Sequence, residues 1–253
     1  NEDEPAAFGV PPYVGFHIRY VAGVFEEHNI AYEYITIDQW RERIRRSENI
    51  SNLNLDHVTG VALIAGAVVP GKYLRGTPIS LRETEELLAM MPHEIPIVAG
   101  GWAIRGWRQQ GWNPLRRNLF LTVQDTDATL DHYLRKMSWK HQRRDADQWR
   151  RWAHLGASSK AVTKHPDIDG PLTYEVEVYQ GCVRYKNGCK FCIEPKKGVP
   201  IDRPVEDILA EVTSAIDSGV KHVRLGGMTD VYTYICLLYT SPSPRDATLS
   251  RMP

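Results

Sequence analysis

The sequence predicts an α/β protein in which an open parallel sheet is followed by the beginning of a parallel β/α barrel. Buried strand-like runs alternate with helical patterns up to about residue 136. A second strand–helix–strand unit begins near residue 172, after a stretch at 156–171 that contains Ser, Gly and Pro. The composition of the 253 residues, 42% hydrophobic and 25% charged, is that of an ordinary globular protein. Lys+Arg and Asp+Glu both number 31, so the net charge indicates neither a nucleic-acid nor a membrane partner.

Apolar periodicity predicts the elements of the first half. After a loop at 1–15, a helix is expected because apolar residues recur at helical spacing from Ile18 to Phe25. Continuous apolar runs predict buried parallel strands, and Ser80 with Glu83 forms the sequence pattern of a capping box. The alternation is that of a Rossmann-like sheet, whose first strand is expected to be missing. The further elements expected are strands at 30–37, 57–69, 95–101 and 118–123, and helices at 80–91 and 126–137.

Glycine-containing loops follow several of these strands. Ligands of open α/β sheets bind beyond the carboxyl ends of the strands, where the sequence has 66–76, 99–106 and 124–127. Glycines there would let the backbone approach a ligand, or they would only make tight turns, and both interpretations stay open. Neither a Walker A motif nor G-x-G-x-x-G is present.

The segment 135–155 is basic, with seven Lys/Arg against two Asp, interleaved with three tryptophans. Such a segment can hold single-stranded RNA through phosphate contacts and stacking. We favour a linker helix with Trp149 and Trp152 packed inward, because a run of charges is usually a solvated helix face.

A strand–helix–strand unit follows, with a strand at 173–180, a helix at 201–219 and a strand at 221–227. The helix is expected to have one apolar stripe that includes Leu209 and Ile216. Because neighbouring residues of a strand point to opposite faces, the polar residues of both strands share one face, directed either at a polar substrate or at solvent. These polar residues are Glu175, Glu177, Tyr179 and Arg224.

Three of the four cysteines lie within eleven residues, between the first strand of this unit and its helix. Few, clustered cysteines fit a metal site in a reducing cytosol. A structural zinc site needs four ligands, and neither His165 in the linker nor His222 at the far end of a strand is well placed to be the fourth. We therefore favour an iron–sulfur cluster over zinc, since three thiolates would leave one iron of a cubane open to a small molecule.

The cysteines Cys182, Cys189 and Cys192 resemble the cluster-binding triad of the radical S-adenosylmethionine (SAM) superfamily. Their pattern is Cys-x6-Cys-x2-Cys, with a longer first gap than the common Cys-x3-Cys-x2-Cys. The resemblance implies that these three residues hold a [4Fe-4S] cluster that binds SAM and cleaves it reductively to a 5′-deoxyadenosyl radical.

Other residues extend the resemblance over about 172–234. Phe191 matches the aromatic residue before the last cysteine, and Gly226 and Gly227 resemble the glycine motif near the SAM amino group. The catalytic residues stay unknown. The first half resembles the cobalamin-binding-type domain that precedes many radical SAM domains. The whole chain resembles uncharacterised members of the superfamily that carry a C-terminal helix-hairpin-helix. A histidine-ligated cobalamin is not expected, because no Asp-x-His-x-x-Gly motif occurs.

The resemblance predicts four regions: a Rossmann-like domain at 1–136, a basic helix and linker at 137–171, the first part of a radical SAM barrel at 172–235 and a non-native tail at 236–253. It implies a cytoplasmic enzyme without a membrane partner, an electron donor such as a ferredoxin or flavodoxin, and a substrate that is a small molecule, a peptide or RNA. The alternative is a non-catalytic, zinc-stapled RNA-binding protein. Because the tail resembles a translated sequencing adapter, we expect this fragment to be poorly soluble and inactive, and Cys236 not to be a ligand.

Overall fold

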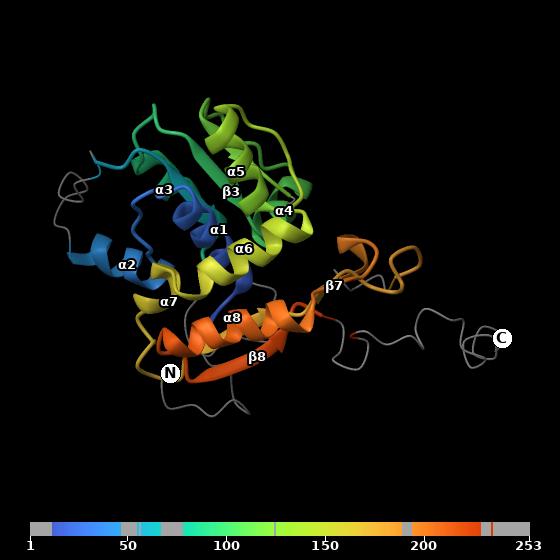
Figure 1. Cartoon of the computed structure of the whole chain (residues 1–253). Coiled ribbons are helices and arrows are strands. Elements are labelled where there is room, and N and C mark those ends of the chain that lie inside the picture. Colours follow the sequence, from blue (N-terminus) through green and yellow to red (C-terminus); the bar gives the residue numbers. More distant parts are fainter. Residues whose placement is uncertain are drawn as a thin grey trace, which may run out of the picture.

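The computed structural model of the chain describes residues 12–46, 55, 57–66, 78–123, 125–188, 194–228 and 234. This part contains two parallel three-stranded sheets and one short antiparallel pair, with helices packed around them (Figure 1). The predicted α/β class is therefore confirmed. No helix of the described part has the length and apolar character needed to cross a membrane. Predictions for Cys189, Phe191, Cys192 and 236–253 fall outside the described residues.

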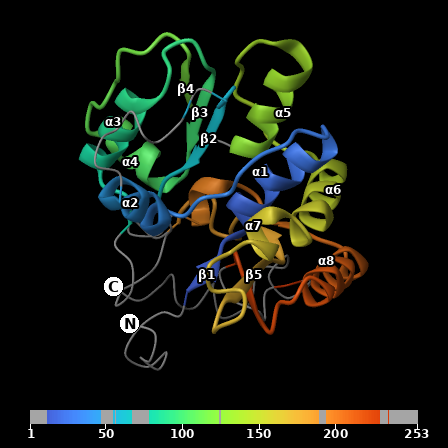
Figure 2. The same ribbon diagram turned by 90° about the vertical axis from the view of Figure 1, so that its left-hand side faces the viewer.

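The first sheet has the order β2-β3-β4, with strands Val61–Ile64, Ile97–Gly100 and Leu119–Leu121, all parallel. Helices cover both faces: α3 and α4 lie on one side, α1 and α5 on the other (Figure 2). The strands alternate accordingly, since Ile97 and Ala99 pack in one core cluster and Val98 in the other. This confirms three of the four strands predicted for the first half. The helices span Phe16–Glu27 (α1), Ile37–Arg46 (α2), Leu81–Met90 (α3), Trp102–Gln109 (α4) and Thr126–Lys136 (α5).

The strand expected at 30–37 is wrong. Residues 30–36 have no regular structure, and α2 begins at Ile37. Thr36 and Gln39 form two hydrogen bonds across the start of this helix. The backbone N–H of Gln39 donates to Thr36 Oγ1 over 3.2 Å, and the backbone N–H of Thr36 donates to Gln39 Oε1 over 2.9 Å. This capping accounts for the helical start at Ile37, and residues 30–35 belong to none of the sheets in the described part of the chain. Helix α4 was also not predicted from the sequence.

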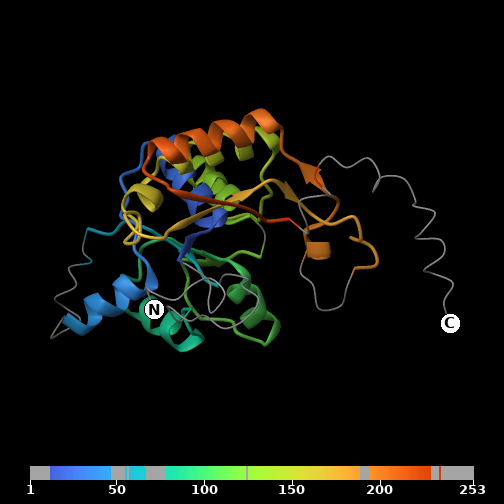
Figure 3. The same ribbon diagram turned by 90° about the horizontal axis from the view of Figure 1, so that it is seen from below.

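The second sheet has the order β1-β5-β8, with strands Tyr13–Val14, Thr173–Glu177 and His222–Gly226. The chain passes from β5 through α8 (Val205–Asp217) to the parallel strand β8, so the predicted strand–helix–strand unit is present. Helix α8 lies along one face of this sheet (Figure 3). Strand β1 comes from the loop predicted at 1–15, so the segment before α1 contributes to the second sheet. The rest of the barrel and the domain boundaries stay predictions.

Helix α6 (Ala146–Ala157) joins the two halves and is followed by the short α7 (Lys160–Thr163). It crosses α1 closely: a Cβ atom on Gly23 would come within 2.4 Å of the Trp152 carbonyl oxygen, and one on Gly156 within 2.2 Å of the Arg19 carbonyl oxygen. Trp149 and Trp152 are buried in the core between these helices. The predicted inward packing of Trp149 and Trp152 is confirmed, but the basic segment is not one solvated helix: α6 begins only at Ala146, and the side chain of Arg144 is buried.

Helix α8 has two adjacent apolar stripes instead of the single one predicted. Ile208 and Ala215 pack on the sheet, whereas Leu209 and Ile216 on the neighbouring stripe are 59% and 55% exposed. On the edge strand β8, Val223 and Leu225 are also largely exposed. Apolar surface thus remains uncovered beside the last described strand.

Candidate functional site

The cysteine loop leaves the carboxyl end of β5 and returns to it. Its outgoing and returning segments, the two legs of the loop, lie side by side, and we call this part the neck. Strands β6 (Tyr179–Gln180) and β7 (Ile201–Asp202) pair antiparallel there. The amide of Cys182 donates to the Gly198 carbonyl over 3.0 Å and closes the loop. Gly181, with φ of 101°, lies so close to the returning leg that a Cβ atom would come within 2.5 Å of the Val199 carbonyl oxygen. A glycine is therefore required where the loop begins.

Cys182 is a free, buried thiol, 6% exposed, at the base of this loop. Its sulfur accepts a hydrogen bond from the Arg184 amide over 3.4 Å, and its carbonyl accepts from the Tyr185 amide over 2.9 Å. A turn that directs a backbone N–H at sulfur suits a metal-bound thiolate, because hydrogen bonds to cluster sulfurs tune iron–sulfur sites. The sulfur of Cys182 thus has one N–H partner and is free of any disulfide, and its role as a metal ligand stays a prediction.

The structure does not test the triad as a set. Within the described residues no group of three His, Cys, Asp or Glu side chains is placed to hold a metal ion, and Cys189 and Cys192 are not among those residues. Helix η2 (Glu194–Lys197) follows them and leads into the returning leg. His222 begins β8 at the end of the sheet opposite the loop, as expected, and His165 is buried beside Tyr34 and Asp167.

The predicted glycine motif lies beside the start of this loop. Gly226 is in register with Glu177, the last residue of β5. A Cβ atom on Gly226 would come within 2.4 Å of Glu175 Oε1, and one on Gly227, where φ is 69°, within 2.6 Å of Glu177 Cγ. Gly227 needs glycine because its φ is positive and Glu177 fills the space, whereas at Gly226 the obstacle is the flexible side chain of Glu175. Contact of this motif with SAM stays a prediction.

The four residues predicted to share a polar face of the second sheet differ in their exposure to solvent. Glu175 and Arg224 are register partners, and their side-chain charges lie 3.6 Å apart. Arg224 is about half exposed, whereas Glu177 and Tyr179 are buried. The face is therefore solvated at β8 and enclosed at the carboxyl end of β5.

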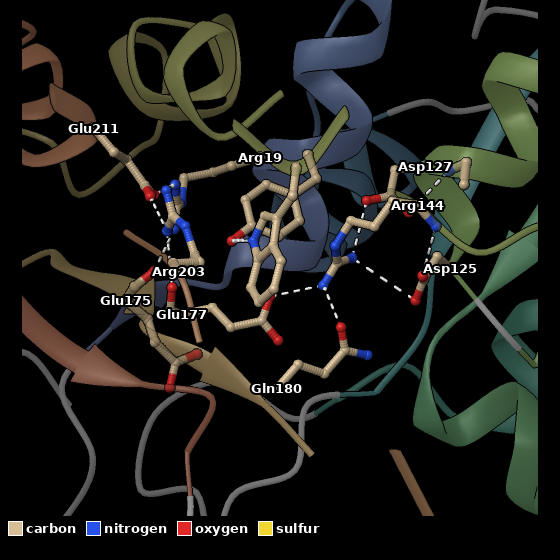
Figure 4. Close-up of polar contacts among 12 residues, drawn as sticks. Arg19, Asp125, Asp127, Arg144, Glu175, Glu177, Gln180, Arg203 and Glu211 are labelled. Atoms are coloured by element: carbon tan, nitrogen blue, oxygen red, sulfur yellow. Dashed lines mark hydrogen bonds and ion pairs between the residues drawn. The ribbon is translucent and has the colours of Figure 1, made fainter. Parts of the chain in front are cut away.

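Glu177 is enclosed by an ionic cluster that was not predicted from the sequence. Arg144, which precedes α6, donates to Glu177 Oε2 over 2.7 Å and to Asp127 Oδ2 of α5 over 3.1 Å (Figure 4). Burial raises the pKa of Glu177 to about 7, although the positive charges of Arg144 and Lys197 oppose the shift. Burial also raises the pKa of Asp127 to about 6, with Arg144 opposing the shift and Asp125 adding to it.

A second ionic cluster holds the edge of β5. In the described part of the chain, strand β1 pairs with β5 at Thr173 and Tyr174, and the carbonyls of Glu175 and Glu177 point to the same edge further along β5. Arg19 of α1 donates to the Glu175 carbonyl, and Arg203 donates to the Glu177 carbonyl over 2.8 Å. Both guanidinium groups also bond the carboxylate of Glu211, each over 2.5 Å.

At the carboxyl end of the first sheet, protein atoms occupy the space that the glycines leave. A Cβ atom on Gly100 would come within 1.9 Å of Thr126 Oγ1, and one on Gly101 within 2.3 Å of the Ala65 carbonyl oxygen. Asp125 and Asp127, from the loop expected at 124–127, face Arg144. At Gly100 and Gly101 the close neighbours are thus protein atoms, a role that neither of the two interpretations included, and ligand binding at this edge stays a prediction.

Two known proteins are similar to this chain over most of its length. An uncharacterised protein of Methanocaldococcus jannaschii is 32% identical over 245 residues, which are 92% of this chain and 43% of that protein. An uncharacterised protein of Archaeoglobus fulgidus is 30% identical over 249 residues, which are 98% of this chain and 43% of that protein. The chain thus spans less than half the length of these two relatives.

A shorter segment is similar to enzymes with a named reaction. A tRNA-2-methylthio-N(6)-dimethylallyladenosine synthase of Halorhodospira halophila is 46% identical over 63 residues, 24% of this chain and 12% of the enzyme. The synthase of Stutzerimonas stutzeri is 43% identical over 63 residues, 24% of this chain and 14% of the enzyme. No family model matches the chain, and no solved structure matches it.

Proposed function

We propose that the chain is part of a radical SAM iron–sulfur enzyme. Cys182, Cys189 and Cys192 would hold a [4Fe-4S] cluster, and Phe191 would lie beside the SAM adenine. Gly226 and Gly227 would approach the SAM amino group. The observation that carries the proposal is the environment of Cys182: a buried thiol that accepts an N–H bond, in a closed loop at the carboxyl end of a strand in a strand–helix–strand unit. In parallel α/β barrels active sites lie at that end of the strands.

Similarity supports the same proposal. The 63-residue match is to radical SAM enzymes that modify tRNA, and the resemblance in the cysteine region covers a stretch of similar length. When bound, the cluster would supply the electron that cleaves SAM, and a ferredoxin or flavodoxin would be its donor. The protein's own contribution would be to orient the cofactor and exclude water. RNA is the substrate class that the named relatives favour over a small molecule or a peptide.

The alternative, a zinc-stapled RNA-binding protein, has less support. Trp149 and Trp152 of the basic segment are buried, and Trp139 stacks on Tyr133 and Phe120, with ring centroids 3.8 Å and 5.4 Å apart. These tryptophans are therefore engaged within the protein, which leaves less aromatic surface for stacking bases.

Anaerobic reconstitution separates the two functions. The metal-free chain is incubated with iron and sulfide, or with zinc, and its iron, sulfide and zinc contents and visible spectrum are measured. We expect a brown protein with about four irons per chain, and an electron paramagnetic resonance signal after reduction that changes when SAM is added. A colourless protein that takes up zinc and no sulfide would overturn the proposal.

A further inference from the structure

The neck of the cysteine loop is held by an arginine on its returning leg. Arg203 directly follows β7, and its amide donates to the Val178 carbonyl over 3.1 Å. Its guanidinium group bonds both the Glu177 carbonyl and Glu211 of α8, and the residue is 3% exposed. One residue thus connects the returning leg to the end of β5 and to the helix behind the sheet.

Arg19 provides a comparison within the same cluster. It bonds the other oxygen of the Glu211 carboxylate and the Glu175 carbonyl, two residues earlier on β5. Arg19 belongs to α1, and its hydrogen bonds go to Tyr174, Glu175 and Glu211, none of which is in the cysteine loop. Each arginine therefore bonds the Glu211 carboxylate and one backbone carbonyl of β5, but only Arg203 belongs to the neck.

We propose that Arg203 is a positioning residue that fixes the cysteine loop, and with it Cys182, in the geometry that holds the metal. The metal-binding part of this inference rests on the proposed function; the effect on the loop does not. A lysine at this position would keep the positive charge beside Glu211. It would lose the planar fork that reaches the carboxylate and the carbonyl together. Hydrogen bonds of charged groups contribute about 1.5–3 kcal/mol, so loss of one should open the loop at least about tenfold more often.

The experiment compares Arg203→Lys with Arg19→Lys in the 253-residue chain. Both variants are first checked by circular dichroism and urea unfolding. In the metal-free proteins, the rate at which iodoacetamide alkylates Cys182 is followed by peptide mass spectrometry. We expect alkylation to be at least about tenfold faster in Arg203→Lys and within about twofold of wild type in Arg19→Lys. Equal rates in the two variants would overturn the proposal.

A second measurement needs no variant. If the neck opens as one unit, the Cys182 and Arg203 amides should exchange hydrogen at similar rates in the wild-type chain. A Cys182 amide that exchanges fast beside a protected Arg203 amide would contradict the proposal.

After reconstitution, iron loss to a chelator should be faster in Arg203→Lys than in Arg19→Lys and wild type, as expected for alkylation. If wild type takes up no cluster but the alkylation difference holds, the proposed function fails and the role of Arg203 in the loop stands. If wild type holds a cluster and both variants lose iron equally, the role of Arg203 fails.

Discussion

Arg144 donates a hydrogen bond to Glu177 over 2.7 Å, and both side chains are only 1% exposed. The bond joins the segment that precedes α6 to the carboxyl end of β5. Arg144 also pairs with Asp127 of α5 over 3.1 Å, which connects the second sheet to the carboxyl end of the first. The base of the cysteine loop is thus tied electrostatically to the first half of the protein.

Replacing Arg144 should destabilise the fold strongly. Arg144→Gln would leave Glu177 and Asp127 buried without their cation, and breaking a buried pair in this way costs about 3–5 kcal/mol. Urea unfolding measures the free energy of unfolding. Arg143→Gln is the matched control, because Arg143 is exposed and its loss should cost less than about 0.5 kcal/mol. Similar losses in the two variants would show that the buried cluster contributes little.

Glu177 should make the stability depend on pH. The pKa of its carboxyl is raised from 4.5 to about 7 in the folded protein, chiefly by burial, with Arg144 and Lys197 opposing the shift. Between these two values the folded state binds more protons than the unfolded chain, so stability falls as pH rises through this window and levels off above it. Asp127, whose pKa is raised to about 6, acts in the same direction at lower pH.

Comparison of wild type with Glu177→Gln isolates this contribution. Unfolding free energies are measured from pH 4.5 to pH 8. The difference between the two proteins should change by about 3 kcal/mol across the window, in the direction of wild type losing stability as pH rises. A difference that stays constant with pH would contradict the expected shift.

The sequence predicts the parts of this molecule whose signals are local. Long apolar runs identify β2, β3 and β4, and strict alternation identifies β5. The ionic clusters have no such signal, since Arg144 and Glu177 are 33 positions apart and Arg19 and Glu211 are 192 apart. The strand expected at 30–37 fails because β-branched and aromatic content alone does not provide a neighbouring strand, and the capping bonds of Thr36 start a helix at Ile37.

The three clustered cysteines should be required for metal binding. Cys182→Ala, Cys189→Ala and Cys192→Ala should each abolish uptake of iron and sulfide, because a cubane on two thiolates loses much of its protein ligation. Iron and acid-labile sulfide per chain are the measurements. Cys236→Ala is the control and should retain wild-type uptake. Loss of the cluster in Cys236→Ala with retention in Cys182→Ala would show that the triad is assigned wrongly.

The exposed stripe of α8 should promote self-association. Leu209 is 59% exposed, so Leu209→Glu should reduce aggregation in dynamic light scattering and change the unfolding free energy by less than about 0.5 kcal/mol. Its neighbour Ile208 is 9% exposed, so Ile208→Glu should cost about 3 kcal/mol or more. Equal destabilisation by the two variants would indicate that the Leu209 stripe is covered.

Two glycines near α4 should respond oppositely to alanine. Gly101 has φ of 100°, and its Cβ atom would lie 2.3 Å from the Ala65 carbonyl oxygen, so Gly101→Ala should cost about 2 kcal/mol or more. Gly106 has no atom within 4 Å of its Cβ position, so Gly106→Ala should stabilise the helix by about 0.5–1 kcal/mol. Thermal unfolding measures both. Tolerance of alanine at Gly101 would mean that the end of β3 has room to adjust.

Strand β1 also constrains the order in which this protein is made. Tyr13 pairs with Thr173, so β1 leaves the ribosome before a partner that is encoded 160 residues later. At about 5–20 residues per second, that delay is roughly 10–30 s. The intervening sheet can collapse during this interval, while the second sheet cannot begin until β5 has been synthesised. Closure of a loop of this length is slow and raises the contact order of the fold. The second sheet, which bears the cysteine loop, is therefore expected to be the last of the two to fold during synthesis.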